Sequence, residues 1–208
     1  MSTPPTLTQA FNAHAEAYDR SVEPLLPLKL MLHTLIRCQF SGLPGRARLL
    51  LAGAGTGAEA RFLAPLFPEW HFTLVDPAGS MLAVARRHAQ AEGFADRCTF
   101  HEGLVSSLSA EPFHAATSVL VSHFLVSAEQ RTAYFEAIAG RLVPGGHLFN
   151  ADLCADRGAA SFGEVMEVWL RLAGTPDERK DQFRSSFGRD FAVHGPAEVE
   201  TMIAGAGF

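Results

Sequence analysis

Lysine is almost absent from this sequence of 208 residues. The chain carries 17 basic and 22 acidic residues, and Lys29 and Lys180 are the only lysines. The arginines are spread along the chain, with Arg86 and Arg87 as the one adjacent pair. Binding to a nucleic-acid backbone usually needs a patch or stripe of basic side chains. The sequence therefore shows no nucleic-acid-binding patch, and its net charge of −5 gives no attraction toward a polyanion.

Long apolar runs are also missing. Every apolar run is interrupted well before the roughly 18 residues that a membrane span needs. The opening Met-Ser-Thr-Pro-Pro has neither the basic cluster nor the apolar centre of a signal peptide. We therefore expect a cytoplasmic protein with no membrane partner.

Cysteine is scarce, and its pattern excludes a disulfide framework. The three cysteines, Cys38, Cys98 and Cys154, are an odd number at wide spacing. They are predicted to be reduced thiols in the core. The chain has nine histidines, but none forms a close pair with another histidine, cysteine or carboxylate at metal-ligand spacing. No metal site is predicted.

What the chain does have is a hydrophobic share of 48%, which is enough for the core of one domain. Short apolar runs alternate with segments of helical spacing, a pattern that indicates parallel strands joined by helices. The expected fold class is α/β, with a doubly wound, mainly parallel sheet, two helices before it and a helical insertion after the fifth strand. Ser80 is a plausible N-cap for the helix that it begins. The predicted helices are 7–18, 24–40, 58–67, 80–91, 129–142, 162–172, 176–187 and 196–204, and the predicted strands are 47–52, 71–75, 98–101, 115–122 and 147–152.

A glycine-rich turn, Gly53-Ala54-Gly55-Thr56-Gly57, joins the first predicted strand to a helix. Such a turn places bare backbone and a helix N-terminus at the carboxyl edge of the sheet, where open α/β folds bind ligands. Asp76 ends the next predicted strand, about 20 residues further on, and its carboxylate can accept hydrogen bonds from both hydroxyls of a ribose. The two features predict a nucleoside site. With Ala58, the turn also satisfies the Ala variant of the dinucleotide fingerprint, so a nicotinamide cofactor stays open.

Four motifs in order resemble the class I S-adenosylmethionine (SAM) dependent methyltransferases. Residues 49–57 match the first motif of that family, and residues 76–81 match the segment after its second strand. Residues 102–104 match the loop after its third strand, and residues 142–146, Leu-Val-Pro-Gly-Gly, match the turn before its fifth. The resemblance covers the chain from the first helix to the last residue. It implies a Rossmann-like methyltransferase fold, SAM as the cofactor and methyl transfer as the reaction.

The resemblance also implies roles for single residues. The glycine turn would face the methionine part of the cofactor, and Asp76 would bind the ribose hydroxyls. Met81 would pack on the adenine or, equally, between helix and sheet, and the backbone at Leu104 and Val105 would meet the adenine rim. The full set of cofactor-binding residues implied in this way is Gly53, Ala54, Gly55, Gly57, Asp76, Pro77, Met81, Gly103, Leu104, Val105 and Ser122.

Two positions depart from the family pattern. The family usually has an acid two residues before the first glycine, where this chain has Leu51, and often a second acid where this chain has Leu104. Each change removes a charge-assisted contact with the cofactor, worth on the order of 1.5–3 kcal/mol. We therefore expect SAM to bind through backbone groups and Asp76.

The segment from Phe11 to Asp19 resembles the signature that opens many small-molecule methyltransferases, in which this helix closes over the cofactor. Residues 1–208 would then be a single domain, with a lid at 1–40, a cofactor-binding core at 47–152 and a helical extension at 157–205. Tyr18 would point its hydroxyl into the site, or else pack into the core with Phe11. His123 would be a general base or a wall residue at the strand end, beside Phe124 as an acceptor contact.

A narrower resemblance is to the carboxy-SAM synthases. It rests on Arg-Ser-Val-Glu-Pro at 20–24 and on the helical insertion at 157–187. Those enzymes bind a carboxylate through cationic groups, a role that Arg20, Arg184 or Arg189 would take here. Beside a methyltransferase for a small, partly apolar acceptor, three alternatives therefore stay open. They are a carboxy-SAM synthase-like enzyme of tRNA wobble-uridine modification, an NAD(P)-dependent oxidoreductase and a non-catalytic SAM-binding relative.

The family resembled here ends its sheet with a sixth strand and an antiparallel seventh. Ala206-Gly207-Phe208 stands where the run into the sixth strand begins, so we expect the C-terminal hairpin to be missing through truncation. The amphipathic helix at 162–172 is expected to cover the sheet or a partner subunit in a homodimer.

Overall fold

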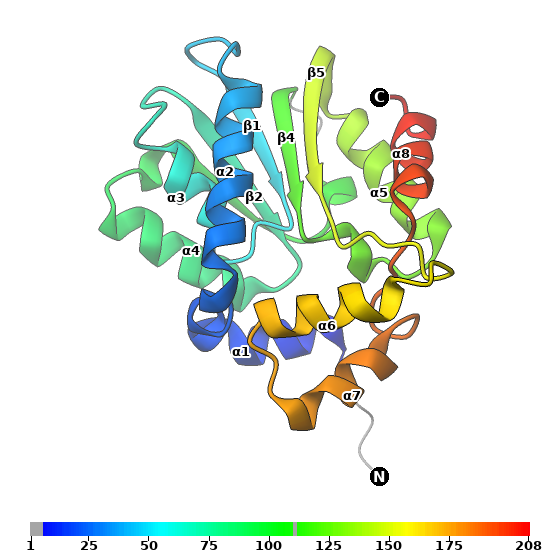
Figure 1. The fold of residues 1–208 in the computed structure, drawn as a ribbon. Coiled ribbons are helices and arrows are strands. Elements are labelled where there is room, and N and C mark those ends of the chain that lie inside the picture. The colour runs from blue at the N-terminus through cyan, green and yellow to red at the C-terminus, as the bar shows by residue number, and fades with distance from the viewer. Residues whose placement is uncertain (1–5, 110–111) are drawn as a thin grey trace.

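The computed structural model describes residues 6–109 and 112–208 of the chain. At its centre lies a five-stranded sheet in the order β3-β2-β1-β4-β5, in which every neighbouring pair is parallel (Figure 1). The strand order reverses between β1 and β4, as in a doubly wound sheet, which confirms the predicted fold class. The strands are β1 Arg48–Ala52, β2 His71–Asp76, β3 Cys98–Glu102, β4 Phe113–Val119 and β5 Leu142–Ala151.

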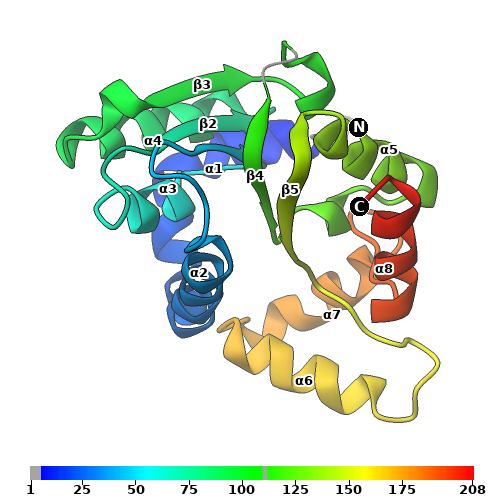
Figure 2. The same cartoon turned by 90° about the horizontal axis from the view of Figure 1, so that it is seen from above.

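Helices cover both faces of this sheet. The helices are α1 Leu7–Ser21, α2 Leu26–Phe40, α3 Ala58–Leu63, α4 Gly79–Ala91, α5 Ala128–Ala139, α6 Phe162–Leu172, α7 Asp177–Ser186 and α8 Pro196–Gly205. α2, α3 and α4 lie on one face, and α5 and α8 lie on the other (Figure 2). α1, α6 and α7 lie beyond the carboxyl ends of the strands, at the bottom of Figure 1. This end of the sheet is the one at which α/β folds bind ligands.

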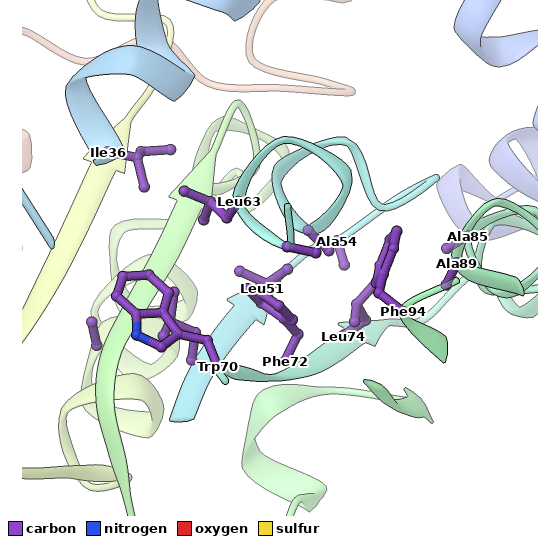
Figure 3. Packing of buried hydrophobic residues seen from close by; sticks show 14 of the residues in the cluster. Ile36, Leu51, Ala54, Leu63, Trp70, Phe72, Leu74, Ala85, Ala89 and Phe94 are labelled. Carbon is purple, nitrogen blue, oxygen red and sulfur yellow. The ribbon is translucent and has the colours of Figure 1, made fainter. Parts of the chain in front are cut away.

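The hydrophobic core consists of one cluster on each face of the sheet. Leu49 and Leu51 of β1 point into the cluster under α2, α3 and α4, which Figure 3 shows. Leu50 and Ala52 point into the cluster under α5 and α8, because successive side chains of a strand point to opposite faces. These four of the five side chains of β1 are almost fully buried. Burying each leucine contributes about 1.5–3 kcal/mol, so the strand that carries the glycine turn is firmly held.

Several helices differ from the prediction at their ends. The helix predicted at 24–40 begins as a 3-10 turn, η1 Glu23–Leu25, because Pro24 and Pro27 lack the N–H of an α-helical hydrogen bond. The helix predicted to reach 67 ends at Leu63, and the one predicted to reach 142 ends at Ala139. Ser80 is not the N-cap of α4. Its own N–H instead donates to Oδ1 of Asn12 at 2.8 Å.

The strands β4 and β5 also differ from the prediction. β4 ends at Val119, because Leu120 adopts a positive φ of 57° that breaks the extended conformation. Ser122 and His123, predicted on the strand, lie in the 3-10 turn η4 Ser122–Phe124. β5 begins at Leu142, so the Pro-Gly-Gly predicted as a turn lies inside it, next to an irregular register against β4.

The prediction that the cysteines lie in the core was wrong for Cys38 and Cys154, whereas Cys98 packs against the core cluster. Cys38 and Cys154 are exposed, and Cys98 is half-buried. On α2 the buried residues are His33, Ile36 and Phe40. Cys38 is two positions from both Ile36 and Phe40, so it points to the opposite side of the helix, toward solvent.

The described ranges contain no helix that combines the length and hydrophobicity needed to cross a bilayer. They also contain no strand after β5. Two isolated bridges lie within the segment that follows β5, one between Cys154 and His194 and one between Phe187 and Phe191. This segment is joined to the rest of the chain by the packing of α8 on α5 and by a hydrogen bond from the N–H of Ala192 to the carbonyl of His123 at 2.7 Å.

His33, a buried histidine on α2, should make stability depend on pH. Its ring centre lies 5.3 Å from that of Phe62, and burial, followed by the charge of Lys29, lowers its pKa from 6.5 to about 4. The unfolded chain therefore takes up this proton at a higher pH than the folded chain does. We expect the unfolding free energy in urea to fall by about 2 kcal/mol between about pH 7 and 4.5. A His33→Leu variant with the same pH dependence would contradict this assignment.

Candidate cofactor and active site

A cavity of about 540 Å³ opens at the carboxyl ends of β1, β2 and β4. Its floor is made by three segments that follow these strands: the glycine turn, residues 76–78 and residues 119–121. α1 and α5 provide its walls. The cavity lies at the point where the strand order reverses, and its volume is within the range of small-molecule sites.

The glycine turn after β1 needs glycine for two reasons. Gly53, Gly55 and Gly57 have φ values of 72°, 52° and 80°, a region that side chains rarely allow. A Cβ on Gly53 would also lie 2.5 Å from Cγ2 of Val121. The turn is fixed to β2, since the N–H groups of Gly53 and of the next residue donate to the carbonyl of Val75 at 2.8 and 2.9 Å. The backbone of the turn is therefore held open at the cavity floor.

Asp76, at the end of β2, fixes the turn from the other side. Its Oδ2 accepts from the N–H of Gly55 at 2.9 Å, and its Oδ1 accepts from the N–H of Ala78 at 2.8 Å. Burial raises the pKa of Asp76, and these two hydrogen bonds oppose that shift. Each oxygen keeps a second lone pair, so the carboxylate can still accept two hydrogen bonds from a ligand in the cavity.

α1 is fastened over this site by polar contacts along its length. Asn12 accepts from the N–H at the start of α4, and Glu16 forms an ion pair with Arg87 at 2.6 Å. Near the end of α1, Asp19 accepts a hydrogen bond from the hydroxyl of Thr56 in the glycine turn at 2.6 Å. The last contact joins the helix directly to the turn. The position of α1 is thus coupled to the shape of the cavity floor.

Aromatic side chains of α1 face the cavity. The ring centre of Phe11 lies 5.4 Å from that of Phe124 in an edge-to-face contact, and both rings line the cavity. Tyr18 lines it as well, and burial, followed by the charges of Glu59, Asp19 and nearby Asp76, raises its pKa to about 12. The hydroxyl therefore stays protonated in a region of negative potential, which favours a positively charged ligand.

Another part of the cavity wall is formed by Met81 of α4 and by the segment that follows β3. Met81 is buried, and its Cε would be 3.5 Å from a Cβ on Gly55. Gly103, Leu104 and Val105 continue the wall after β3. Val105 is buried, whereas 61% of Leu104 is exposed. Met81, Leu104 and Val105 make this part of the lining largely apolar, which suits a purine ring.

Ser122 and His123 belong to a buried polar cluster outside the cavity lining. The side chain of Asp152 is fully buried, and it pairs with Nδ1 of His123 and accepts from the hydroxyl of Ser122. Burial raises the pKa of Asp152, but these hydrogen bonds and the charge of His123 bring it below its ordinary value. The carbonyl of His123 also accepts from the N–H of Ala192 at 2.7 Å. The cluster thereby joins the turn after β4 to the helical extension.

Arg131 of α5 completes this cluster. Its guanidinium is fully buried, and Nη2 donates to the carbonyl of Ala192 at 2.8 Å. Burial lowers the pKa of Arg131, and the charge of nearby Asp152 opposes this lowering. A buried guanidinium needs such a compensating charge. The charges of Arg131 and Asp152 therefore partly offset each other in the interior.

Comparison with known proteins identifies the family to which this site belongs. Residues 49–146 match the family model described as a methyltransferase domain. These residues, which include the glycine turn and Asp76, therefore belong to the class I SAM-dependent methyltransferase family. Its cofactor is SAM, as predicted, and the match decides against the alternative of a nicotinamide oxidoreductase.

Individual relatives of the methyltransferase domain are longer proteins. An uncharacterized protein from Synechococcus is 33% identical over 159 residues, which are 74% of this chain and 36% of that protein. The malonyl-[acyl-carrier protein] O-methyltransferase from Bacillus cereus is 32% identical over 92 residues, 44% of this chain and 34% of that protein. The structure of phosphoethanolamine N-methyltransferase 2 from Haemonchus contortus, in complex with SAM, matches with a TM-score of 0.60 at 21% identity, covering 85% of this chain and 36% of that one. The chain therefore spans about a third of the length of these proteins.

The cavity brings together ten of the residues predicted for the site of the methyltransferase domain. They are Tyr18, Gly53, Gly55, Asp76, Pro77, Met81, Gly103, Leu104, Val105 and Phe124. The lining does not include Ala54, Gly57, Ser122 or His123. Within the described residues, no three His, Cys, Asp or Glu side chains gather to hold a metal ion.

The arginines predicted to contact a substrate do not line this cavity. Arg20 is exposed on α1. Arg184 forms ion pairs with Glu167 and Asp181, and Arg189 forms one with Asp190, all at the surface of the extension. The structure therefore gives no support to the carboxylate-binding role that the carboxy-SAM synthase alternative required.

The lining also contains residues that the sequence analysis missed. Leu120 and Val121 lie between β4 and η4, and Leu7, Thr8 and Tyr134 come from the two wall helices. The residues at the end of β4 include no glycine, so nothing in the sequence indicates the positive φ at Leu120. α1 and α5 are amphipathic or mixed helices, and no local pattern shows which of their side chains meets the sheet edge.

The residues of the cavity fit SAM. The turn leaves open space beside Gly55, where an added Cβ would meet only Cε of Met81 at 3.5 Å, and Asp76 has free acceptor positions for two hydroxyls. The charges that raise the pKa of Tyr18 favour the cationic end of the cofactor. The apolar end near Met81 suits its adenine.

Proposed function

We propose that this methyltransferase domain transfers the methyl group of SAM to a small, uncharged and largely apolar acceptor. The composition of the cavity lining carries this proposal. Outside the segments that resemble the cofactor motifs, apolar side chains such as Leu7, Phe11 and Leu125 dominate it. Asp76 is the one charged residue among the described residues that line the cavity. Burying a charged acceptor against such a lining costs more than burying a neutral one.

The domain would contribute by positioning and by excluding water. Bound SAM supplies a methyl group activated by a sulfonium, and its transfer to the nucleophile of the acceptor leaves S-adenosylhomocysteine. α1, joined to the glycine turn through Asp19 and Thr56, covers the cofactor. Phe11 and Phe124 meet edge to face and narrow the space for the acceptor. Holding two reactants in line in a water-poor cavity accounts for much of the rate of such a transfer.

The proposal assigns no general base to His123. The residue does not line the cavity, and its Nδ1 is engaged with Asp152. We propose instead that His123 stabilises the turn that presents Phe124 to the acceptor. An acceptor whose nucleophile reacts without losing a proton to the protein fits this arrangement.

The proposal can be tested by following methyl transfer from radiolabelled SAM to pairs of small aromatic amines, thiols and phenols. In each pair one member is uncharged and the other carries an added carboxylate. We expect transfer to at least one uncharged member, with kcat/KM about tenfold above that of its carboxylated partner. Transfer only to the carboxylated members, or only to added tRNA or protein, would overturn the proposed acceptor class.

A further inference from the structure

The methyltransferase domain lacks both acids that the family pattern places around the cofactor. Leu51 lies in the core cluster with Ala54 and Leu74, where an aliphatic side chain fills the space (Figure 3). Leu104 is largely exposed. SAM carries an ammonium group as well as a sulfonium, and a cation buried in a cavity needs hydrogen-bond acceptors. Another group of this chain therefore has to accept from the ammonium.

Tyr134 of α5 is placed to do so. It lines the cavity, and its Oη lies 3.0 Å from Oγ of Ser118 and 3.4 Å from the carbonyl oxygen of Ala52. Ala52 is the last residue of β1, directly before Gly53. A phenol has one proton to donate, and the Ser118 and Ala52 oxygens can both take it. The remaining hydrogen-bonding capacity of the hydroxyl is that of an acceptor.

The charges around Tyr134 favour a cation at this oxygen. Burial raises the pKa of Tyr134, and the carboxylates of Asp152 and Asp76 raise it further, although the hydrogen bond with Ser118 opposes the shift. Tyr18, in the same cavity, is affected by Asp76 in the same way. Tyr134 is therefore a neutral oxygen acceptor in a field that attracts positive charge.

We propose that the hydroxyl of Tyr134, beside the carbonyl of Ala52, accepts a hydrogen bond from the ammonium group of SAM and compensates, from the opposite face of the sheet, for the acid absent at Leu51. This inference rests on the proposed function, because it concerns the cofactor of the same site. It explains how a chain with neutral residues at both family positions binds the ammonium at the end of the ligand that also carries the sulfonium and the carboxylate. It also gives α5 a part in cofactor binding, next to the glycine turn.

The test is calorimetric titration of the parent and of Tyr134→Phe with three nucleosides. S-adenosylhomocysteine keeps the ammonium but lacks the sulfonium, and 5′-methylthioadenosine lacks both. We expect Tyr134→Phe to raise the Kd for SAM and for S-adenosylhomocysteine about tenfold and the Kd for 5′-methylthioadenosine less than twofold. An equal rise for all three ligands, no rise for any, or a rise for SAM alone would overturn the inference. A parent that binds none of the three would instead refute the proposed function.

A second variant keeps the test decisive if loss of the hydroxyl disturbs folding. Tyr134→Phe leaves the fully buried hydroxyl of Ser118 without its partner. The double variant Tyr134→Phe/Ser118→Ala removes both polar groups and restores an apolar pairing. The same selective loss is expected for it, with a thermal midpoint close to that of the parent. A double variant that binds SAM as tightly as the parent does would contradict the role of Tyr134.

Discussion

Asp76→Ala should weaken the binding of S-adenosylhomocysteine by about 100-fold. The substitution removes a carboxylate with free positions for two hydroxyls, and hydrogen bonds to a charged group are the stronger kind. It also releases the N–H groups of Gly55 and Ala78, which hold the floor of the cavity in place. Calorimetric titration measures the change, and circular dichroism checks that the variant is folded.

A matched control for Asp76 stands on the neighbouring strand. Glu102 lies opposite Asp76 in the register of β2 and β3, but it is exposed and does not line the cavity. Glu102→Gln should leave the Kd within about twofold of that of the parent, since surface charges contribute little. Asp76→Ala with an unchanged Kd, or equal losses in both variants, would refute the role of Asp76.

Asp152→Asn should destabilise the methyltransferase domain by about 3–5 kcal/mol. The variant leaves the fully buried guanidinium of Arg131 without its compensating charge and weakens the bonds to Ser122 and His123. Urea unfolding measures the loss. The double variant Asp152→Asn/Arg131→Met, which removes both charges, should recover part of it. A single variant as stable as the parent would show that the two charges are not coupled.

The carboxylate of Asp152 should also make the stability of the folded chain depend on pH. Because the pKa of Asp152 is lower in the folded chain than in the unfolded chain, its contribution is complete above about pH 4, the ordinary pKa of an aspartate. The contribution is lost as the pH falls through the folded pKa. The parent should therefore lose stability in this acidic range more steeply than Asp152→Asn does. This window lies below the one in which His33 acts, so the two effects can be separated.

The parts of the site that the sequence predicts are those that depend on local chain geometry. Gly53 and Gly55 mark a turn whose backbone conformation needs glycine, and Asp76 ends an apolar strand. The parallel sheet brings such strand ends together without further information. For this reason the parallel sheet is as predicted, and the glycine turn and Asp76 lie together at the cavity floor, even though helix ends differ by several residues.

The parts that the sequence analysis missed depend on contacts between distant segments. Tyr134 reaches the cavity because α5 packs on the sheet, and its partner Ala52 is 82 residues away. At the end of β4, Leu120 adopts a backbone conformation that few non-glycine residues adopt, which ends the strand early. His123 is thereby turned toward Asp152, a partner that no local pattern could indicate.

Direct titration of the purified protein tests whether this chain binds SAM. We predict saturable binding of both SAM and S-adenosylhomocysteine with one site per chain, and no measurable binding of NADH under the same conditions. The absence of binding heat for SAM and for S-adenosylhomocysteine from a folded sample, or saturable binding of NADH instead, would contradict the account.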